Sequence, residues 1–317
     1  MRSLLAVTST TGPLLLAVVL LLGLFGLFIP NFLSTDNLIN LGQQISTNAI
    51  LAFGLTLVIL IGGIDLSVGA LVALVGTATV YLLTRNVPLP VALLAGLVLA
   101  GTFGGLHGAG ATFTPMPPFI ITLATMQIAR GLALRFNEGR PMPIPTSQEL
   151  FLELGNGRIL GDQLPVPVII MVLVFAVMSV LLHLTRFGQH LYAIGGNREA
   201  ARCTGINIAR HEILAYVLCS LCVALAGFIH CSQLYAAEPG SGQGYELNAI
   251  AAVVVGGTSF TGGRGTMFGT LLGAVIIGVL EKGLNQAGIH YSTQWVVKGA
   301  VILAAVYLDV RRRSVKN

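Results

Sequence analysis

The fold is decided by the stretch from Asn48 to Leu74, which reads NAILAFGLTLVILIGGIDLSVGALVAL. Two apolar runs, near 45–61 and 68–84, approach the length of a membrane-crossing helix, which needs about 20 apolar residues. Between them lies GGIDLSVG, whose glycines favour an unwound turn around the acidic residue Asp65. The stretch therefore predicts two helices that cross a lipid bilayer and an irregular connection between them.

The composition extends this prediction to the whole chain. Of its 317 residues, 55% are hydrophobic and 9% are charged, whereas an ordinary soluble domain carries about 25% charged residues. A soluble fold of this size could not bury so much apolar surface. The 39 glycines favour a closely packed helix bundle, because small residues let membrane helices approach one another. We expect an all-α, polytopic integral membrane protein with residues 1–317 in one domain.

About ten spans are expected, with eight to eleven as the defensible range. They are placed near 13–29, 45–61, 68–84, 91–107, 118–134, 166–184, 213–231, 246–257, 267–281 and 295–308.

The distribution of basic residues predicts the orientation. Lys and Arg concentrate in cytoplasmic segments, and four arginines lie in 185–212 while a basic tail occupies 311–316. The loop 135–164, where acids outnumber arginines, is then external. Both termini are expected in the cytoplasm, and the run 13–29 is expected to stay as a first span rather than to be cleaved.

An internal repeat relates two parts of the chain, about 45–184 and 213–308. Asn48-Ala49-Ile50 recurs as Asn248-Ala249-Ile250 at an offset shared by three glycine pairs. Those pairs are Gly62 and Gly262, Gly63 and Gly263, and Gly69 and Gly269. Paired glycine-interrupted segments indicate a transport pathway. The ten-span count puts the copies in the same orientation, but one miscounted span would invert them, so the symmetry stays open.

Asp65 has two interpretations. It can belong to a helix cap or structural network, with Ser67 helping to cap the helix that follows. It can also act at the pathway or its gate, because an acid within the membrane is costly and often functional. A second glycine-rich stretch, GGTSFTGGRGT at 256–266, is either a tight cytoplasmic turn or irregular backbone that lines a cavity.

A short charged helix is predicted in the segment 185–212. Asn197 can cap a helix that begins at Arg198, Glu199 suits its first turn, and Gly205 is a typical stop signal. Such a short helix is marginal alone. We therefore expect it to pack on the inner face of this protein or on a cytoplasmic partner.

The sequence offers no pattern typical of catalysis, metal binding or nucleotide binding. The six histidines lack ligand spacing, and neither a P-loop nor a dinucleotide fingerprint is present. No cofactor and no metal site are expected, and any ATP must be hydrolysed by another chain. Nucleic acid is not an expected partner, because the basic residues lie between or beyond the apolar runs.

Four segments carry a resemblance to a known family. They are 48–74, PFIITLATMQIARGL at 118–132, TRFGQHLYAIGGN with TGIN in 185–207, and 244–285, which contains GGTSFTGGRGTMFGTLLGA. The chain resembles the permease subunits of bacterial monosaccharide ATP-binding-cassette (ABC) importers, the ribose-type branch most closely. At His107 it departs from the family, whose members often have Asn there.

The resemblance implies a subunit of the bacterial inner membrane rather than an enzyme. Its partners would be ABC ATPase subunits, a periplasmic sugar-binding protein, a second permease copy or paralogue, and the lipid bilayer. The glycine pairs named above match the signature turns of the family. The segment that resembles the ATPase-coupling helix includes Gly195, Gly196, Asn197, Arg198, Glu199, Ala200, Ala201, Arg202 and Gly205.

A neutral sugar needs hydroxyl and amide partners along its path. Candidates for the lining are Gln44, Asn48, Gln127 and Asn248, with Asp65 and Ser67 at a possible gate. Packing between helices explains membrane Asn and Gln equally well. An ion-coupled secondary sugar transporter is the alternative, with Asp65 as its one suitable carboxylate. Dependence of uptake on ATP or on a proton gradient separates the two. Ribose is the nearest expected substrate.

Overall fold

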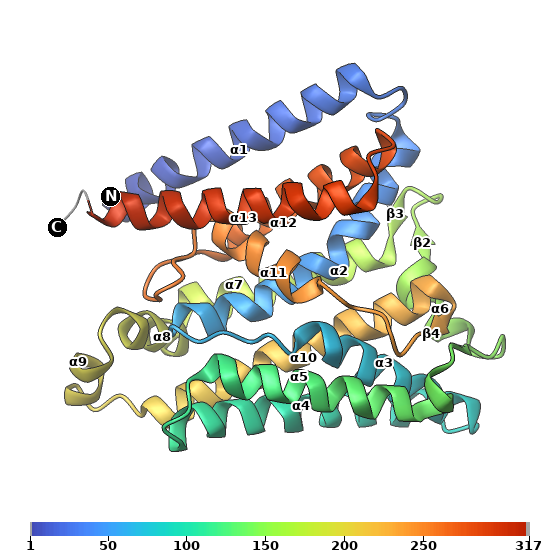
Figure 1. Cartoon of the computed structure of the whole chain (residues 1–317), viewed down its shortest axis with the longest axis horizontal. Coiled ribbons are helices and arrows are strands. Elements are labelled where there is room, and N and C mark those ends of the chain that lie inside the picture. Colours follow the sequence, from blue (N-terminus) through green and yellow to red (C-terminus); the bar gives the residue numbers. More distant parts are fainter. Residues whose placement is uncertain (1, 315–317) are drawn as a thin grey trace.

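The computed structural model describes residues 2–314 and consists almost wholly of helices (Figure 1). In chain order the elements are α1 (Arg2–Phe28), α2 (Thr35–Leu60), α3 (Val68–Thr84), α4 (Leu89–Phe113), α5 (Pro118–Arg135), the 3₁₀ helix η1 (Phe136–Gly139), β1 (Met142–Pro143), α6 (Glu149–Asn156), β2 (Arg158–Ile159), β3 (Leu164–Pro165), α7 (Val166–Leu184), α8 (Arg186–Gly196), α9 (Arg198–Cys203), α10 (Ile208–Leu234), β4 (Ala236–Ala237), α11 (Tyr245–Val255), α12 (Met267–Gln286) and α13 (Tyr291–Ser314).

The all-α, polytopic fold is confirmed. Within residues 2–314, seven helices are long and apolar enough to cross a membrane, namely α1, α2, α4, α5, α7, α10 and α12. The apolar helices α3 and α11 are shorter, and α13 covers the range of the tenth expected span. The total of ten spans therefore stays a prediction.

Two helices begin well before the apolar runs that were expected as spans, because polar caps extend them. Helix α2 begins ten residues before the expected residue 45, where the Ser34 hydroxyl accepts a hydrogen bond from the Asn37 N–H. Helix α10 begins before the expected residue 213, where the Asn207 side chain accepts one from the Arg210 N–H at 3.0 Å. Capping residues at these positions start a helix outside its apolar run.

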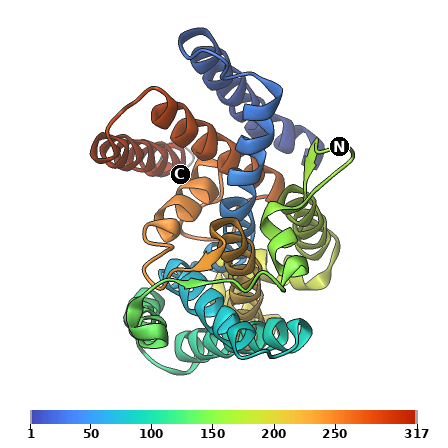
Figure 2. The same ribbon diagram turned by 90° about the vertical axis from the view of Figure 1, so that its right-hand side faces the viewer.

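Helices α2 and α10 form the interior, and α1 lies at the edge of the bundle (Figure 2). Glycines set the closest approach between α4 and α10. A Cβ atom on Gly104 would lie 2.7 Å from the Val217 Cα, and one on Gly108 would lie 2.5 Å from the Ile213 Cα. The two glycines are four residues apart, which is the small-xxx-small spacing that lets membrane helices pack backbone to backbone.

The two ends of the bundle differ. Helices α8 and α9, the start of α1 and the end of α13 lie at one end (Figure 1). The short pairings of β1 with β4 and of β2 with β3 lie at the other end, close to α6. Segments 185–212 and 135–164 are therefore on opposite sides, as the charge distribution predicted. Which side faces the cytoplasm stays a prediction.

Two non-helical stretches lead into the short helices α3 and α11 from opposite ends of the bundle. Residues 61–67 run back from the α8 end into α3, and residues 238–244 run from β4 into α11 (Figure 1). The second stretch contacts the first turn of α3, where a Cβ atom on Gly69 would overlap the carbonyl oxygen of Gly242, whose φ is +73°. A side chain at Gly69 would push the two backbones apart.

Candidate functional site

The two glycine-rich turns singled out in the sequence contact one another. The Gly263 N–H donates a hydrogen bond to the Leu60 carbonyl oxygen at 2.8 Å. Gly62 and Gly262 have φ values of +79° and +88°, a conformation that favours glycine. A Cβ atom on Gly262 would lie 3.0 Å from the Gly62 nitrogen. The turns at the ends of α2 and α11 thus form one contact.

Two further glycines of the signature lie close to neighbouring groups. A Cβ atom on Gly63 would lie 2.5 Å from the Tyr216 hydroxyl oxygen of α10. A Cβ atom on Gly269 would overlap the Gly256 carbonyl oxygen, so α12 begins directly against the end of α11. These positions therefore have little room for a side chain.

Helix α8 packs on both turns through its last residues. A Cβ atom on Gly195 would overlap the Leu60 carbonyl oxygen and would lie 2.5 Å from the Gly263 nitrogen. The Tyr192 hydroxyl donates to the Gly265 carbonyl oxygen at 2.6 Å. Burial raises the pKa of Tyr192 to about 12, so the hydroxyl keeps its proton at neutral pH. Movement of α8 would therefore displace both turns.

The predicted short helix exists as α9, and its start and stop are confirmed. The Asn197 side chain accepts a hydrogen bond from the Ala200 N–H at 3.0 Å, and Gly205 follows the helix with φ at +83°. Glu199 and Arg202 are exposed and 3.9 Å apart. Ala201 is buried, and it packs the helix toward Ile194 and Ile208. The exposed charges of α9 are available to a partner.

An ion pair fixes α9 to the bundle. Both terminal nitrogens of Arg198 hydrogen-bond the Glu212 carboxylate, and the Thr112 hydroxyl donates to Glu212 Oε2 at 3.0 Å. Glu212 is 4% exposed, so its charge depends on these partners. The sequence interpretation missed Glu212. Its signal was an acid at the very edge of an apolar run, shortly after the arginine that it binds.

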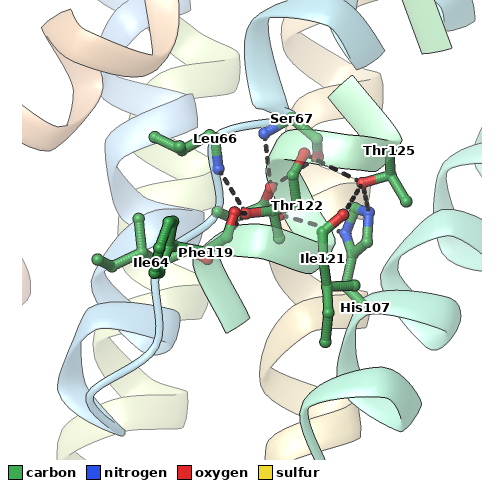
Figure 3. Close-up of polar contacts among 9 residues, drawn as sticks. Ile64, Leu66, Ser67, His107, Phe119, Ile121, Thr122 and Thr125 are labelled. Carbon is green, nitrogen blue, oxygen red and sulfur yellow. Dashed lines mark hydrogen bonds and ion pairs between the residues drawn. The ribbon is translucent and has the colours of Figure 1, made fainter. Parts of the chain in front are cut away.

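Asp65 is fully buried and belongs to a polar network. Figure 3 shows Ser67, His107, Thr122 and Thr125 of this network. Its Oδ1 accepts hydrogen bonds from the Ser67 N–H at 2.9 Å and from the Ser67 hydroxyl at 2.6 Å. Its Oδ2 lies 3.5 Å from His107 Nδ1, and His107 Nε2 lies 2.6 Å from the Thr125 hydroxyl. The expectation that Ser67 caps α3 with its side chain was wrong, because that hydroxyl binds Asp65 instead.

Thr122 completes this network. Its hydroxyl accepts from the Leu66 N–H and donates to the Ile64 carbonyl oxygen, both at 3.2 Å (Figure 3). The non-helical stretch 61–67 is thereby attached to α4 through His107 and to α5 through Thr122. This arrangement favours the structural interpretation of Asp65, and it gives His107 a partner that the sequence did not indicate.

Three of the six pathway candidates line one cavity of about 530 Å³ between α2, α11, α12 and α13. These are Gln44, Asn48 and Asn248. Asp65 and Ser67 are buried elsewhere, and Gln127 lies exposed on α5. The cavity thus brings together amides from two distant parts of the chain.

The same cavity contains a charged pair that the sequence interpretation missed. The Lys298 ammonium lies 2.5 Å from Glu281 Oε1, which also accepts a hydrogen bond from the Asn248 side chain at 2.9 Å. Trp295 lines the cavity one turn before Lys298. An acid and a base inside two apolar runs were the available signal.

Comparison with known proteins identifies the class. Residues 37–306 match the family model described as the branched-chain amino acid transport system permease component. The chain belongs to this family of membrane permeases, which are transport subunits rather than enzymes.

Within this family, the chain is similar to permeases that are named for sugars. The chain is 46% identical to the ribose import permease protein RbsC of Bacillus subtilis over 299 residues, which is 92% of each chain. It is 43% identical to RbsC of Escherichia coli K12 over 94% of this chain and 93% of the relative. The D-allose transport system permease protein AlsC of E. coli K12 is 36% identical over 92% of this chain and 88% of the relative. No solved structure matches.

Proposed function

We propose that this protein is the membrane-spanning permease subunit of an ATP-driven importer that carries ribose or a related monosaccharide. The observation that carries the proposal is the contact of α8 with both glycine turns, next to the exposed helix α9. Helix α9 is exposed and charged, and it is connected through α8 to the turns after α2 and α11. A soluble subunit that binds α9 can therefore displace the membrane helices.

The coupling step follows from these contacts. Closure of an ATPase dimer against α9 displaces Glu199 and Arg202, and the Arg198–Glu212 pair passes the displacement to α10 and α4. Helix α8 passes it to the turns after α2 and α11 through Gly195. Packed interfaces of this kind switch between two distinct arrangements instead of deforming continuously. The displacement of α9 therefore changes which end of the pathway is open.

The substrate class rests on the relatives. Two of those named above import ribose and a third transports D-allose, and another, AraH of E. coli, is named for L-arabinose. All are neutral monosaccharides, whose hydroxyl groups suit the amides of Gln44, Asn48 and Asn248. Ribose is the first substrate to test.

The remaining partners follow from the importer mechanism. Helix α9 and both termini lie on the cytoplasmic side of a bacterial inner membrane, where the ATPase subunits bind. A periplasmic sugar-binding protein delivers substrate to the opposite end, around α6 and the short strand pairs. A second permease copy or a paralogue completes the pathway.

The test exchanges the two exposed charges of α9, with Glu199→Lys and Arg202→Glu together. Because an exposed ion pair contributes about 0–1 kcal/mol, the variant should fold, yet it should lose co-purification of the ATPase subunits and ATP-driven ribose uptake in proteoliposomes. Glu138 and Arg140, an exposed pair 3.8 Å apart at the other end, provide the control, because their exchange should leave co-purification of the ATPase unchanged. Normal ATP-driven uptake by the α9 variant would refute the coupling role. Uptake that follows a proton gradient without ATPase subunits would refute the importer itself.

A further inference from the structure

The cavity between α2, α11, α12 and α13 reaches the middle of the bundle. Asn48 is the fourteenth of the 26 residues of α2, which places it about 20 Å from either end at the rise of an α-helix. Glu281 and Lys298 lie nearer the end at which α12 stops and α13 starts. The volume of about 530 Å³ is typical of a pocket for a small molecule, for which about 300–1,000 Å³ is usual.

Asn48 carries buried polar atoms without a partner beside the cavity. Its Nδ2 and Oδ1 atoms are both buried and have no hydrogen-bond partner among the described residues, although the residue lines the cavity. An unpaired buried amide lowers stability, whereas an apolar side chain of similar shape would not. Rotation of the Asn48 side chain into the cavity would let a ligand that both donates and accepts hydrogen bonds satisfy the two atoms together.

The charged pair leaves further hydrogen-bonding capacity. Glu281 Oε1 takes the bonds from Lys298 and Asn248, and Glu281 Oε2 makes none among the described residues. Each charge of the pair neutralises the other, so the cavity has no excess charge from these two side chains to select an ion. Its free groups suit a neutral molecule with several hydroxyl groups.

Trp295 supplies the apolar wall. Its side chain is about half exposed, and the Lys298 ammonium lies 5.9 Å from the centre of its ring. A flat ring beside hydrogen-bonding groups matches a monosaccharide, which has apolar C–H faces and a polar rim. Indole rings combine such an apolar surface with a polar edge.

We propose that this cavity is a transient monosaccharide-binding site inside the membrane part of the permease. Asn48 and Glu281 bind the hydroxyl groups, and Trp295 packs on the ring of the sugar. This inference rests on the proposed function and deepens it, because it gives the permease itself a role in choosing the sugar.

The chain provides its own reporter, since Trp295 is its only tryptophan. Addition of D-ribose to the purified full-length permease in detergent micelles should change the Trp295 emission in a saturable way, and glycine betaine at equal osmolarity should not. Asn48→Leu should raise the half-saturating ribose concentration about tenfold, the factor that corresponds to about 1.4 kcal/mol. Tyr307→Ala is the matched control, because Tyr307 is an exposed aromatic residue on the same helix and does not line the cavity. It should leave the titration unchanged.

A second measurement separates binding from structure. If Asn48 serves a ligand, Asn48→Leu should keep or raise the thermal stability of the permease while it raises the KM for ribose uptake by the complete importer. If Asn48 serves packing alone, stability should fall and the KM should stay constant, which would overturn the inference. ATP-driven ribose uptake with neither a Trp295 response nor a KM change in Asn48→Leu also overturns it and leaves the proposed function standing. A complex that shows the Trp295 response but no ATP-driven uptake refutes the proposed function and supports the site.

Discussion

The backbone N–H of Gly263 donates to the carbonyl oxygen of Leu60 at 2.8 Å. This bond joins two turns that lie about 200 positions apart in the chain, and the last residues of α8 pack directly on it. Backbone atoms make the contact on all three sides, so it has no side chain that could adapt to a displacement. The contact is therefore a stiff connection between α8 and the turns that follow α2 and α11.

Gly195→Ala should break this connection. Its Cβ atom would overlap the Leu60 carbonyl oxygen, and the neighbouring atoms belong to backbone that cannot rotate away. Forced overpacking typically costs about 1–3 kcal/mol. We expect a lower unfolding temperature and the loss of ATP-driven uptake with continued ATP hydrolysis, measured in proteoliposomes.

The adjacent residue tests the steric explanation. A Cβ atom on Gly196 would have no neighbouring atom within 4 Å, so Gly196→Ala should leave the unfolding temperature unchanged. Equal destabilisation by the two substitutions would show that helix geometry, and not the contact with Leu60, is responsible.

The sequence predicted the membrane bundle and the capped helix α9, and it singled out the paired glycines, because each depends on local composition or spacing. It did not predict that Gly62, Gly195 and Gly262 would meet, since nothing local relates a turn after α2 to the end of α8. The partners of Glu212 and His107 were missed for the same reason. Their binding groups lie on other helices, and only tertiary packing brings them together.

Removal of His107 should destabilise the protein through Asp65. His107→Leu leaves the buried Asp65 carboxyl group without its nearest polar neighbour on α4, and leaving a buried polar group without a partner costs about 1–3 kcal/mol. The double variant Asp65→Asn with His107→Leu should recover part of that loss, because no buried charge remains. Thermal unfolding of the four variants of this cycle is the measurement, and strict additivity would argue against a direct interaction.

Arg130 should be needed to hold the second non-helical stretch. Its Nη1 donates to the carbonyl oxygens of Pro239 and Ser241, both at 2.7 Å, and these carbonyls precede α11. Arg130→Met removes both bonds at a cost of about 1.5–3 kcal/mol each. We expect faster proteolysis within 238–244 and slower uptake, with partial recovery in Arg130→Lys, which keeps the charge but loses the planar guanidinium. Unchanged proteolysis would contradict the role.

The sequence did not show which of its polar membrane residues line the cavity. Gln44, Asn48 and Asn248 were predictable as polar residues in apolar runs, but so was Gln127, which the structure places on an exposed face of α5. Residue type alone does not indicate which face of a membrane helix is turned inward. The exposure of Gln127 and the unpaired amide of Asn48 become visible only when the helices are packed.

Acidification should loosen the contact between α8 and α10. His211 Nδ1 lies 2.7 Å from the Asn207 carbonyl oxygen and therefore carries a proton, which leaves Nε2 to accept from His190 Nδ1 at 2.9 Å. Partial burial, and then the nearby His211 and Arg186, lower the pKa of His190 below its ordinary value of 6.5.

A pKa that is lower in the folded protein means that the unfolded chain binds the proton more tightly, so protonation favours unfolding. The contribution of His190 is therefore complete above about pH 6.5 and is lost as the pH falls through the lower pKa of the folded state. Thermal unfolding at about pH 7.5 and about pH 5.5, on the two sides of the ordinary histidine pKa, should show a loss of stability that is smaller in His190→Gln, which cannot gain a charge. An equal loss in both proteins would place the acid-sensitive group elsewhere, whereas a reduced loss would show that the histidine pair between α8 and α10 makes this end of the bundle sensitive to pH.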